Sequence, residues 1–307
     1  MAYRIRPDKA FTAEVAAIAT SKLKNAISIL ETQADGPHAA IHQARKIFKR
    51  VRALYLLVKT DARDFQRHEN RRLRDIARML STVRNATALI ESVTDLQGHA
   101  RTPDESVALS FAREALTARR DQLVEAETDL SGKLEAAIAG CRQAIDAVGY
   151  LQLEDGSQKT ARRLAKAWKN NLQQATAAIE QCHNQALAEH FHDLRKTGQI
   201  YWMHLALLRG IWPSAMEPKH AQAKQLVDML GKEHDLSVLS ELIDAAPQLF
   251  GRGEDLAHLL GAIIGRQQGL RRDALTLAAI VFADSAERES RIIRVLWRNA
   301  SPGEHGS

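Results

Sequence analysis

The chain has 307 residues, enough for two ordinary domains or for one larger unit made by duplication. The helix-forming residues Ala, Leu, Arg, Gln, Glu and Lys dominate, with only 16 Gly, 7 Pro and 5% aromatic residues, so we predict an all-α protein. The net charge of +6 is too small to identify a partner by itself. Cys141 and Cys182 lie far apart in helical sequence, which argues against a disulfide framework and a cysteine-based zinc site.

No apolar stretch is long enough to cross a bilayer, and the first residues lack the apolar core of a signal peptide. We therefore expect a cytoplasmic protein without membrane contact.

Segments with helical periodicity follow one another along the whole chain. We expect helices at about 8–34, 38–60, 64–96, 104–128, 130–148, 158–186, 187–210, 219–245, 254–282 and 284–299. Turn-forming residues separate them at 35–37, 98–103, 155–157, 212–218 and 247–253. The pattern predicts a helical bundle.

The second of these helices has one cationic side and one apolar side. On a helical wheel the cationic arc of residues 41–58 holds His42, Arg45, Lys46, Lys49, Arg50 and Arg52. In the next helix Arg67, Arg71, Arg74 and Arg78 again share one face. We call these two sets the first and second cationic stripes, and we expect them to form a positive groove on neighbouring helices.

Cationic residues on a helix are often only a solvated face, with acidic residues between them, as between Arg113 and Glu127. From residue 36 to residue 84, however, thirteen Lys and Arg face only four Asp and Glu, whereas residues 151–307 hold 19 basic and 18 acidic residues. Because like charges at helical spacing repel and stabilise nothing, we interpret the stripes as a binding surface for a polyanion.

The chain matches itself at an offset of 150 residues. His42, Arg45 and Lys46 then fall on His192, Arg195 and Lys196, Leu80 falls on Leu230, and Arg74 falls on Lys224. We infer an internal repeat that builds two four-helix bundles, at about 8–150 and 157–300, related by an approximate twofold axis within one domain spanning 1–307.

The recurring histidine, His42 and His192, allows three interpretations: a metal ligand, a proton switch, or a neutral hydrogen-bond donor at the rim of an anion site. No carboxylate or second histidine recurs at ligand spacing in both halves. We favour the anion site and expect no metal.

These residues resemble the CHAD domain family (conserved histidine α-helical domain). Its first signature, a histidine followed by arginine three residues on and then a basic cluster, is similar to residues 42–54, and its counterpart is similar to residues 192–196. Residues 164–169 look like the leucine, aromatic and basic run that opens the family's second bundle. Residues 230–239 resemble its short Leu-Gly-x-x-Arg-Asp-Leu-x-Val-Leu turn.

The resemblance implies two four-helix bundles around a basic channel that binds inorganic polyphosphate. With Lys46 added from the first cationic stripe, the candidate contacts are His42, Arg45, Lys46, Lys49, Arg52, Arg71, Arg74, Arg78, His192, Arg195, Lys196 and Lys224. Gln199, Gly198, Asn85 and His234 depart from the family's pattern, so we expect the second half to be the poorer binder.

Other functions remain open. Nucleic-acid backbone binding would use the same cations, but aromatic stacking platforms do not accompany them. A phosphatase or kinase would need a nucleophile, a carboxylate metal cluster or a phosphate loop, and none is visible. We expect no catalytic residue and no cofactor, and we keep a scaffold associated with protein or a storage granule as a further alternative.

Overall fold

The computed structural model describes residues 3–154 and 156–301, without the side chains of residues 82–84. Residue 155 of the expected 155–157 turn lies outside this part. Within it the chain forms eleven α-helices, two short 3₁₀ helices and no strand, which confirms the all-α prediction. The helices are α1 (Phe11–Thr32), α2 (Pro37–Leu56), α3 (Arg63–Met79), α4 (Thr82–Gln97), α5 (Pro103–Glu125), α6 (Leu130–Gly149), α7 (Ser157–Asn184), α8 (Ala188–Leu208), α9 (Pro213–Ala245), α10 (Glu254–Val281) and α11 (Ala286–Ala300).

The single helix predicted at 64–96 was wrong, because the chain breaks there into α3 and α4. Ser81 lies just after the end of α3. Its backbone N–H and its hydroxyl both donate to the carbonyl oxygen of Arg78, at 3.0 and 2.6 Å. A serine hydroxyl that bonds a nearby carbonyl competes with continued helix, so the break has a local cause.

The turn predicted at 212–218 was also wrong, since α9 begins at Pro213 and contains Pro218. Proline fits the first position of a helix, where the missing N–H would have no intrahelical partner. Pro218 lies in the second turn and removes only one intrahelical hydrogen bond. α9 is therefore a single helix of 33 residues. At the offset of 150 residues, the same positions in the first half form two helices, α3 and α4.

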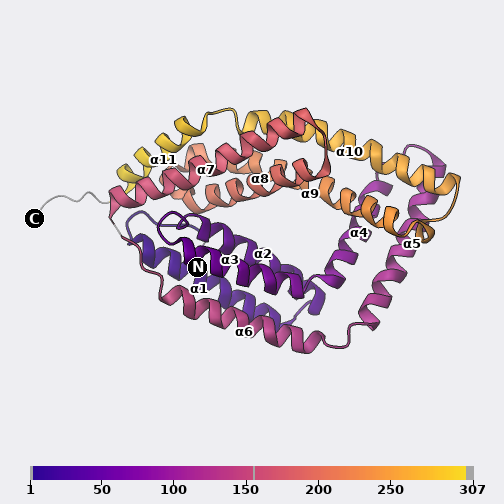
Figure 1. Cartoon of the computed structure of the whole chain (residues 1–307), viewed down its shortest axis with the longest axis horizontal. Coiled ribbons are helices and arrows are strands. Elements are labelled where there is room, and N and C mark those ends of the chain that lie inside the picture. Colours follow the sequence, from indigo (N-terminus) through magenta and orange to yellow (C-terminus); the bar gives the residue numbers. More distant parts are fainter. Residues whose placement is uncertain (1–2, 155, 302–307) are drawn as a thin grey trace, which may run out of the picture.

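Several helix contacts recur in the two halves of the chain, although the division into two four-helix bundles stays a prediction. α1 packs on α2 and α6, as α7 packs on α8 and α11, while α4 packs on α5 as α9 packs on α10. Contacts between the halves join α2 with α8, α4 with α9 and α5 with α10. In Figure 1, α1, α2, α3 and α6 lie along one side and α7, α8 and α11 along the other, with α4 and α5 at one end. The twofold relation itself stays a prediction.

Two hydrophobic cores hold these helices together, and each draws on both halves. The larger core joins Phe48 of α2 and Leu73 of α3 to Trp168 of α7 and Leu205 of α8. The smaller core lies among α4, α5, α9 and α10 and includes Val93, Leu109, Leu239 and Ile263. Because apolar burial spans both halves, their relative position depends on the same hydrophobic effect that forms each helix pair.

α2 and α8 also meet at a buried polar contact. Nε2 of His204 donates to the carbonyl oxygen of Ala53 at 2.9 Å, and His204 is 2% exposed. Burial lowers the pKa of His204 to about 4, so the ring is neutral at pH 7. This contact fixes the approach of the two helices that carry the repeated His-Arg-Lys signature. In the described part of the chain, no helix combines the length and the apolar composition of a membrane span.

Candidate functional site

A cavity of about 650 Å³ lies between α2, α8 and α9, and a neighbouring one of about 320 Å³ extends towards α4. They share the lining residues His42, Lys46, Lys49, Arg195 and Asp235. We call the two together the central cavity. Among the described side chains, its lining has seven Lys and Arg but only two carboxylates, Asp228 and Asp235: the cations are Arg45, Lys46, Lys49, Arg50, Arg195, Lys224 and Lys232.

α2 supplies four of these cations because its opposite face is committed to the core. Ile41, Ala44, Phe48 and Val51 are each less than 5% exposed. An amphipathic helix that buries one side must turn the other side outward. Here that other side borders the cavity.

Two arginines of the first cationic stripe also tie α2 to α3. Nη1 of Arg45 donates to the carbonyl oxygen of Ala77 at 2.6 Å, near the C-terminus of α3. Nε of Arg52 donates to Oδ1 of Asn70 at 2.8 Å. Arg45 lines the central cavity, whereas Arg52 is not among its lining residues.

The pKa of Lys49 reflects both its burial and the positive charges around it. Burial, followed by the guanidinium groups of Arg195 and Arg45, lowers the pKa of Lys49 to about 8, and only the carboxylate of Asp235 opposes this. Burial also lowers the pKa of Arg195, against the opposing influence of Asp235 and Glu233. Its Nε is buried and has no hydrogen-bond partner in the described structure. An anion in the cavity would relieve both effects.

Two histidines stand at the edge of this charged region. The rings of His192 and His234 lie 4.5 Å apart between centroids, at an interplanar angle of 33°. His234 lines the cavity, and burial, Arg195 and His192 lower its pKa to about 4. Nδ1 of His192 is buried without a hydrogen-bond partner in the described structure. Burial and the neighbouring Lys196 lower the pKa of His192 as well. Each ring can donate a hydrogen bond to an anion.

Cations of the second half are more often neutralised by neighbouring carboxylates. Nζ of Lys196 lies 2.8 Å from Asp193, on the side of α8 that faces a different pocket. Lys224 pairs with Asp228 and lies 5.8 Å from the ring centre of Trp202. These pairs reduce the charge that Lys196 and Lys224 offer to a ligand.

The second cationic stripe does not line the central cavity. Arg67 pairs with Asp64, and both Arg74 and Arg78 pair with Asp75. All three arginines and Arg71 are exposed. The cavity thus lies between the first stripe and the second half of the chain, and not between the two stripes as the sequence led us to expect.

Sequence reasoning missed several lining residues. Trp202 and Lys232 line the cavity, but nothing in the sequence pattern of α8 or α9 distinguishes them from ordinary surface or core positions. Nζ of Lys232 lies 2.6 Å from a carboxylate oxygen of Asp95. Asp235 could have been found, because it directly follows His234 in the motif at 230–239. Among the residues that the structure describes, no group of three His, Cys, Asp or Glu side chains could hold a metal ion.

Comparison with protein families matches this chain to the model described as CHAD domain, over residues 20–244. No curated protein is similar enough to be named as a relative. The match runs from α1 to α9, so it contains every residue that lines the central cavity. The chain therefore belongs to the CHAD domain family.

Proposed function

We propose that this protein binds inorganic polyphosphate in the central cavity, which acts as a basic cleft between two helical bundles. The observation that carries the proposal is the lining itself: in the part of the chain that the structure describes, seven cations from α2, α8 and α9 line this cavity together with only two carboxylates. Membership of the CHAD domain family supports the same ligand class. The protein would act without catalysis, as a cytoplasmic sensor, adaptor or targeting module that could accompany a storage granule or a protein partner.

Polyphosphate suits this lining because its charges are regular and its chain is flexible. Arg45 and Arg195 can each offer two parallel N–H donors to one phosphate, whereas Lys46 and Lys49 act as point charges. The rings of His42, His192 and His234 would add hydrogen-bond donors. Because Lys49 and Arg195 lack full hydration, a phosphate gains more from each of them than from an exposed cation.

The two halves would contribute unequally. Lys46, Lys49 and Arg50 of α2 form no ion pair among the described residues, whereas Lys224 and Lys232 of α9 already have carboxylate partners. We therefore expect α2 to provide most of the affinity. The candidate contacts Arg52, Arg71, Arg74, Arg78 and Lys196 would act only where a long polymer extends beyond the cavity.

Calorimetric titration with long-chain polyphosphate tests the proposal. We choose the double variant Lys46→Ala, Arg195→Ala, because Lys46 is exposed and Nε of Arg195 has no hydrogen-bond partner to lose in the described structure. Its affinity should fall at least tenfold, about 1.4 kcal/mol. The matched control is Arg291→Ala, Arg294→Ala, which removes the same charge from the exposed side of α11 and should change little.

Salt and competitors sharpen the result. Affinity should fall steeply between two salt concentrations, because binding releases counterions from the polymer. Equal losses in both double variants would show that only net charge matters and would refute a site in the cavity. Equally tight binding of single-stranded RNA with the same charge would favour the nucleic-acid alternative, and release of orthophosphate would contradict the non-catalytic assignment.

A further inference from the structure

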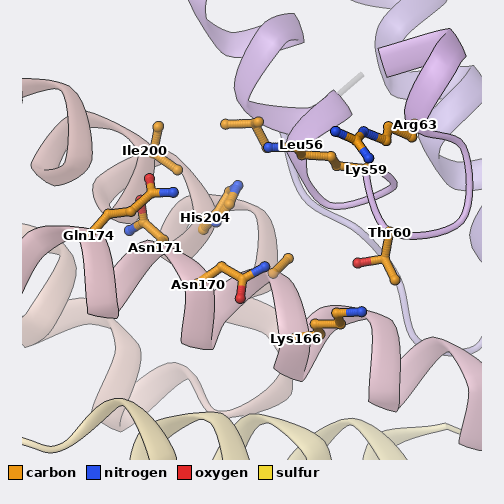
Figure 2. Close-up of a pocket in the computed structure, with 11 residues that line it drawn as sticks. Leu56, Lys59, Thr60, Arg63, Lys166, Asn170, Asn171, Gln174, Ile200 and His204 are labelled. Carbon is orange, nitrogen blue, oxygen red and sulfur yellow. The ribbon is translucent and has the colours of Figure 1, made fainter. Parts of the chain in front are cut away.

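A second cavity, of about 330 Å³, lies on the other side of the contact between α2 and α8. Its lining comes from the end of α2 and the connection to α3 (within 56–63), from α7 (within 166–174) and from α8 (within 200–204). Figure 2 shows the first group facing the row of α7 side chains across the cavity. We call it the α7 pocket. It shares no lining residue with the central cavity.

Of the residues that the structure describes, three cations and no carboxylate line the α7 pocket. Lys59, Arg63 and Lys166 are exposed, and none of them forms an ion pair within the described residues. The acidic residues next to Lys59 and Arg63 in the sequence already have partners: Asp61 pairs with Arg163, and Asp64 pairs with Arg67. The positive charge at this pocket is therefore not cancelled by its sequence neighbours.

The start of α3 adds to this field. Arg63 is the first residue of α3, a helix of 17 residues, and it lies in the pocket lining. The first N–H groups of a helix have no intrahelical partner and carry partial positive charge. An anion at the rim would meet this helix end as well as the three side chains.

The floor of the pocket carries hydrogen-bonding groups. Asn171 is 6% exposed; its Nδ2 donates to the carbonyl oxygen of Thr197 at 3.3 Å, and its Oδ1 is buried without a partner in the described structure. A buried acceptor without a partner costs free energy that a ligand donor would recover. Asn170 and Gln174 line the wall beside it, and Leu56 and Ile200 supply apolar surface.

We infer that the α7 pocket binds a small organic phosphate monoester, with the phosphate held at the rim by Lys59, Arg63 and Lys166. The polar body of the ligand, a sugar or nucleoside, forms hydrogen bonds with the side-chain amides of Asn170 and Gln174 on the pocket wall, beside Asn171. The cavity volume lies at the lower end of the range for small-molecule sites, which fits a ligand of this size. Short inorganic polyphosphate offers the same phosphate group, so the experiment must distinguish it from a phosphate monoester.

Titration of the full chain with glucose 6-phosphate and adenosine 5′-monophosphate tests this inference, with inorganic phosphate, glucose, adenosine and tripolyphosphate as comparison probes. At least one monoester should bind more tightly than inorganic phosphate and than its own dephosphorylated form. The variant Lys59→Ala, Lys166→Ala should weaken that binding at least tenfold. Asn170→Asp, an isosteric change at an exposed position, should weaken it without removing a cation.

Two controls separate this inference from the proposed function. Arg291→Ala, Arg294→Ala should leave monoester binding unchanged, and so should Lys46→Ala, Arg195→Ala in the central cavity. Conversely, Lys59→Ala, Lys166→Ala should leave binding of long-chain polyphosphate within about twofold, because the two cavities share no residue.

The inference is overturned if neither monoester binds at 10 mM, or if the α7 pocket variants bind it as tightly as the wild type. Tripolyphosphate binding that is lost in the pocket variants, with no monoester binding, also overturns it and makes the pocket an extension of the polyphosphate surface.

Discussion

Polyphosphate affinity should depend on pH through two groups in the central cavity, His234 and Lys49. His234 faces Arg195, Lys196 and His192 of α8 and Lys49 of α2. Lys49 faces Arg195 of α8, Asp235 of α9 and two arginines of its own helix. In the free protein the pKa of His234 is about 4 and that of Lys49 about 8, so at pH 7 the ring is neutral and most of the amine is protonated.

A bound phosphate raises both proton affinities. At an effective dielectric constant of about 20, one negative charge ~6 Å away stabilises a protonated group by ~3 kcal/mol, roughly a hundredfold in proton affinity. The complex then holds more protons than the free protein, so affinity must rise as pH falls. For His234 the linkage gives about a tenfold rise from pH 7 to pH 5, and for Lys49 about a ninefold fall from pH 7 to pH 9.

Calorimetry at pH 5, 7 and 9, in buffers of different ionisation enthalpy, measures both the affinity and the proton uptake. His234→Asn should remove about tenfold of the rise towards pH 5, whereas the control His99→Asn, at an exposed histidine that follows α4, should not. Lys49→Arg should abolish the fall towards pH 9, because a guanidinium stays protonated throughout.

An affinity that is flat from pH 5 to pH 9 with no proton uptake would refute this reasoning. A fall in affinity towards pH 5 would refute it as well, because the sign of the linkage would be reversed. A rise that persists in His234→Asn would assign the uptake to another group.

Three further predictions concern the fold. Arg163→Ala should lower the free energy of unfolding by ~2–4 kcal/mol in urea denaturation, because Arg163 is 2% exposed and donates to Asp61 at 2.6 Å; a loss below 0.5 kcal/mol would contradict this. Glu289→Ala should cost ~2–4 kcal/mol in the same assay, since buried Glu289 accepts a 2.8 Å hydrogen bond from Nε1 of Trp168; an unchanged midpoint would contradict it. Burial raises the pKa of Cys141 to about 12, so a disulfide reagent at pH 8 should label this thiol only after unfolding, and rapid labelling of the folded protein would disprove its burial.

Much of the molecule follows from local sequence. Helix-forming composition and apolar periodicity are properties of neighbouring residues, and they predicted the all-α class and most of the helix positions. The same periodicity placed Arg45, Lys46 and Lys49 on one face of α2, where they line the cavity. The repeat offset of 150 residues also linked Arg45 to Arg195, because it compares residue types alone.

Local reasoning failed where a short-range contact competes with helix. The hydroxyl of Ser81 captures a carbonyl of α3 and ends that helix, whereas Pro218 costs too little to delay α9. Hydrophobic periodicity does not indicate how strongly a serine hydroxyl competes for a helix carbonyl, or how little a proline costs near the start of a helix.

A helical wheel determines which side chains share a face, but it does not determine what lies opposite that face. Residues 150 positions apart meet only because apolar surfaces of both halves are buried in common cores. That packing set the first cationic stripe against α8 and α9, brought His234 within 4.5 Å of His192, and left Arg71 of the second stripe exposed. The sequence by itself therefore determined the helices and their charged faces, and the tertiary structure alone decided which of those faces enclose a cavity.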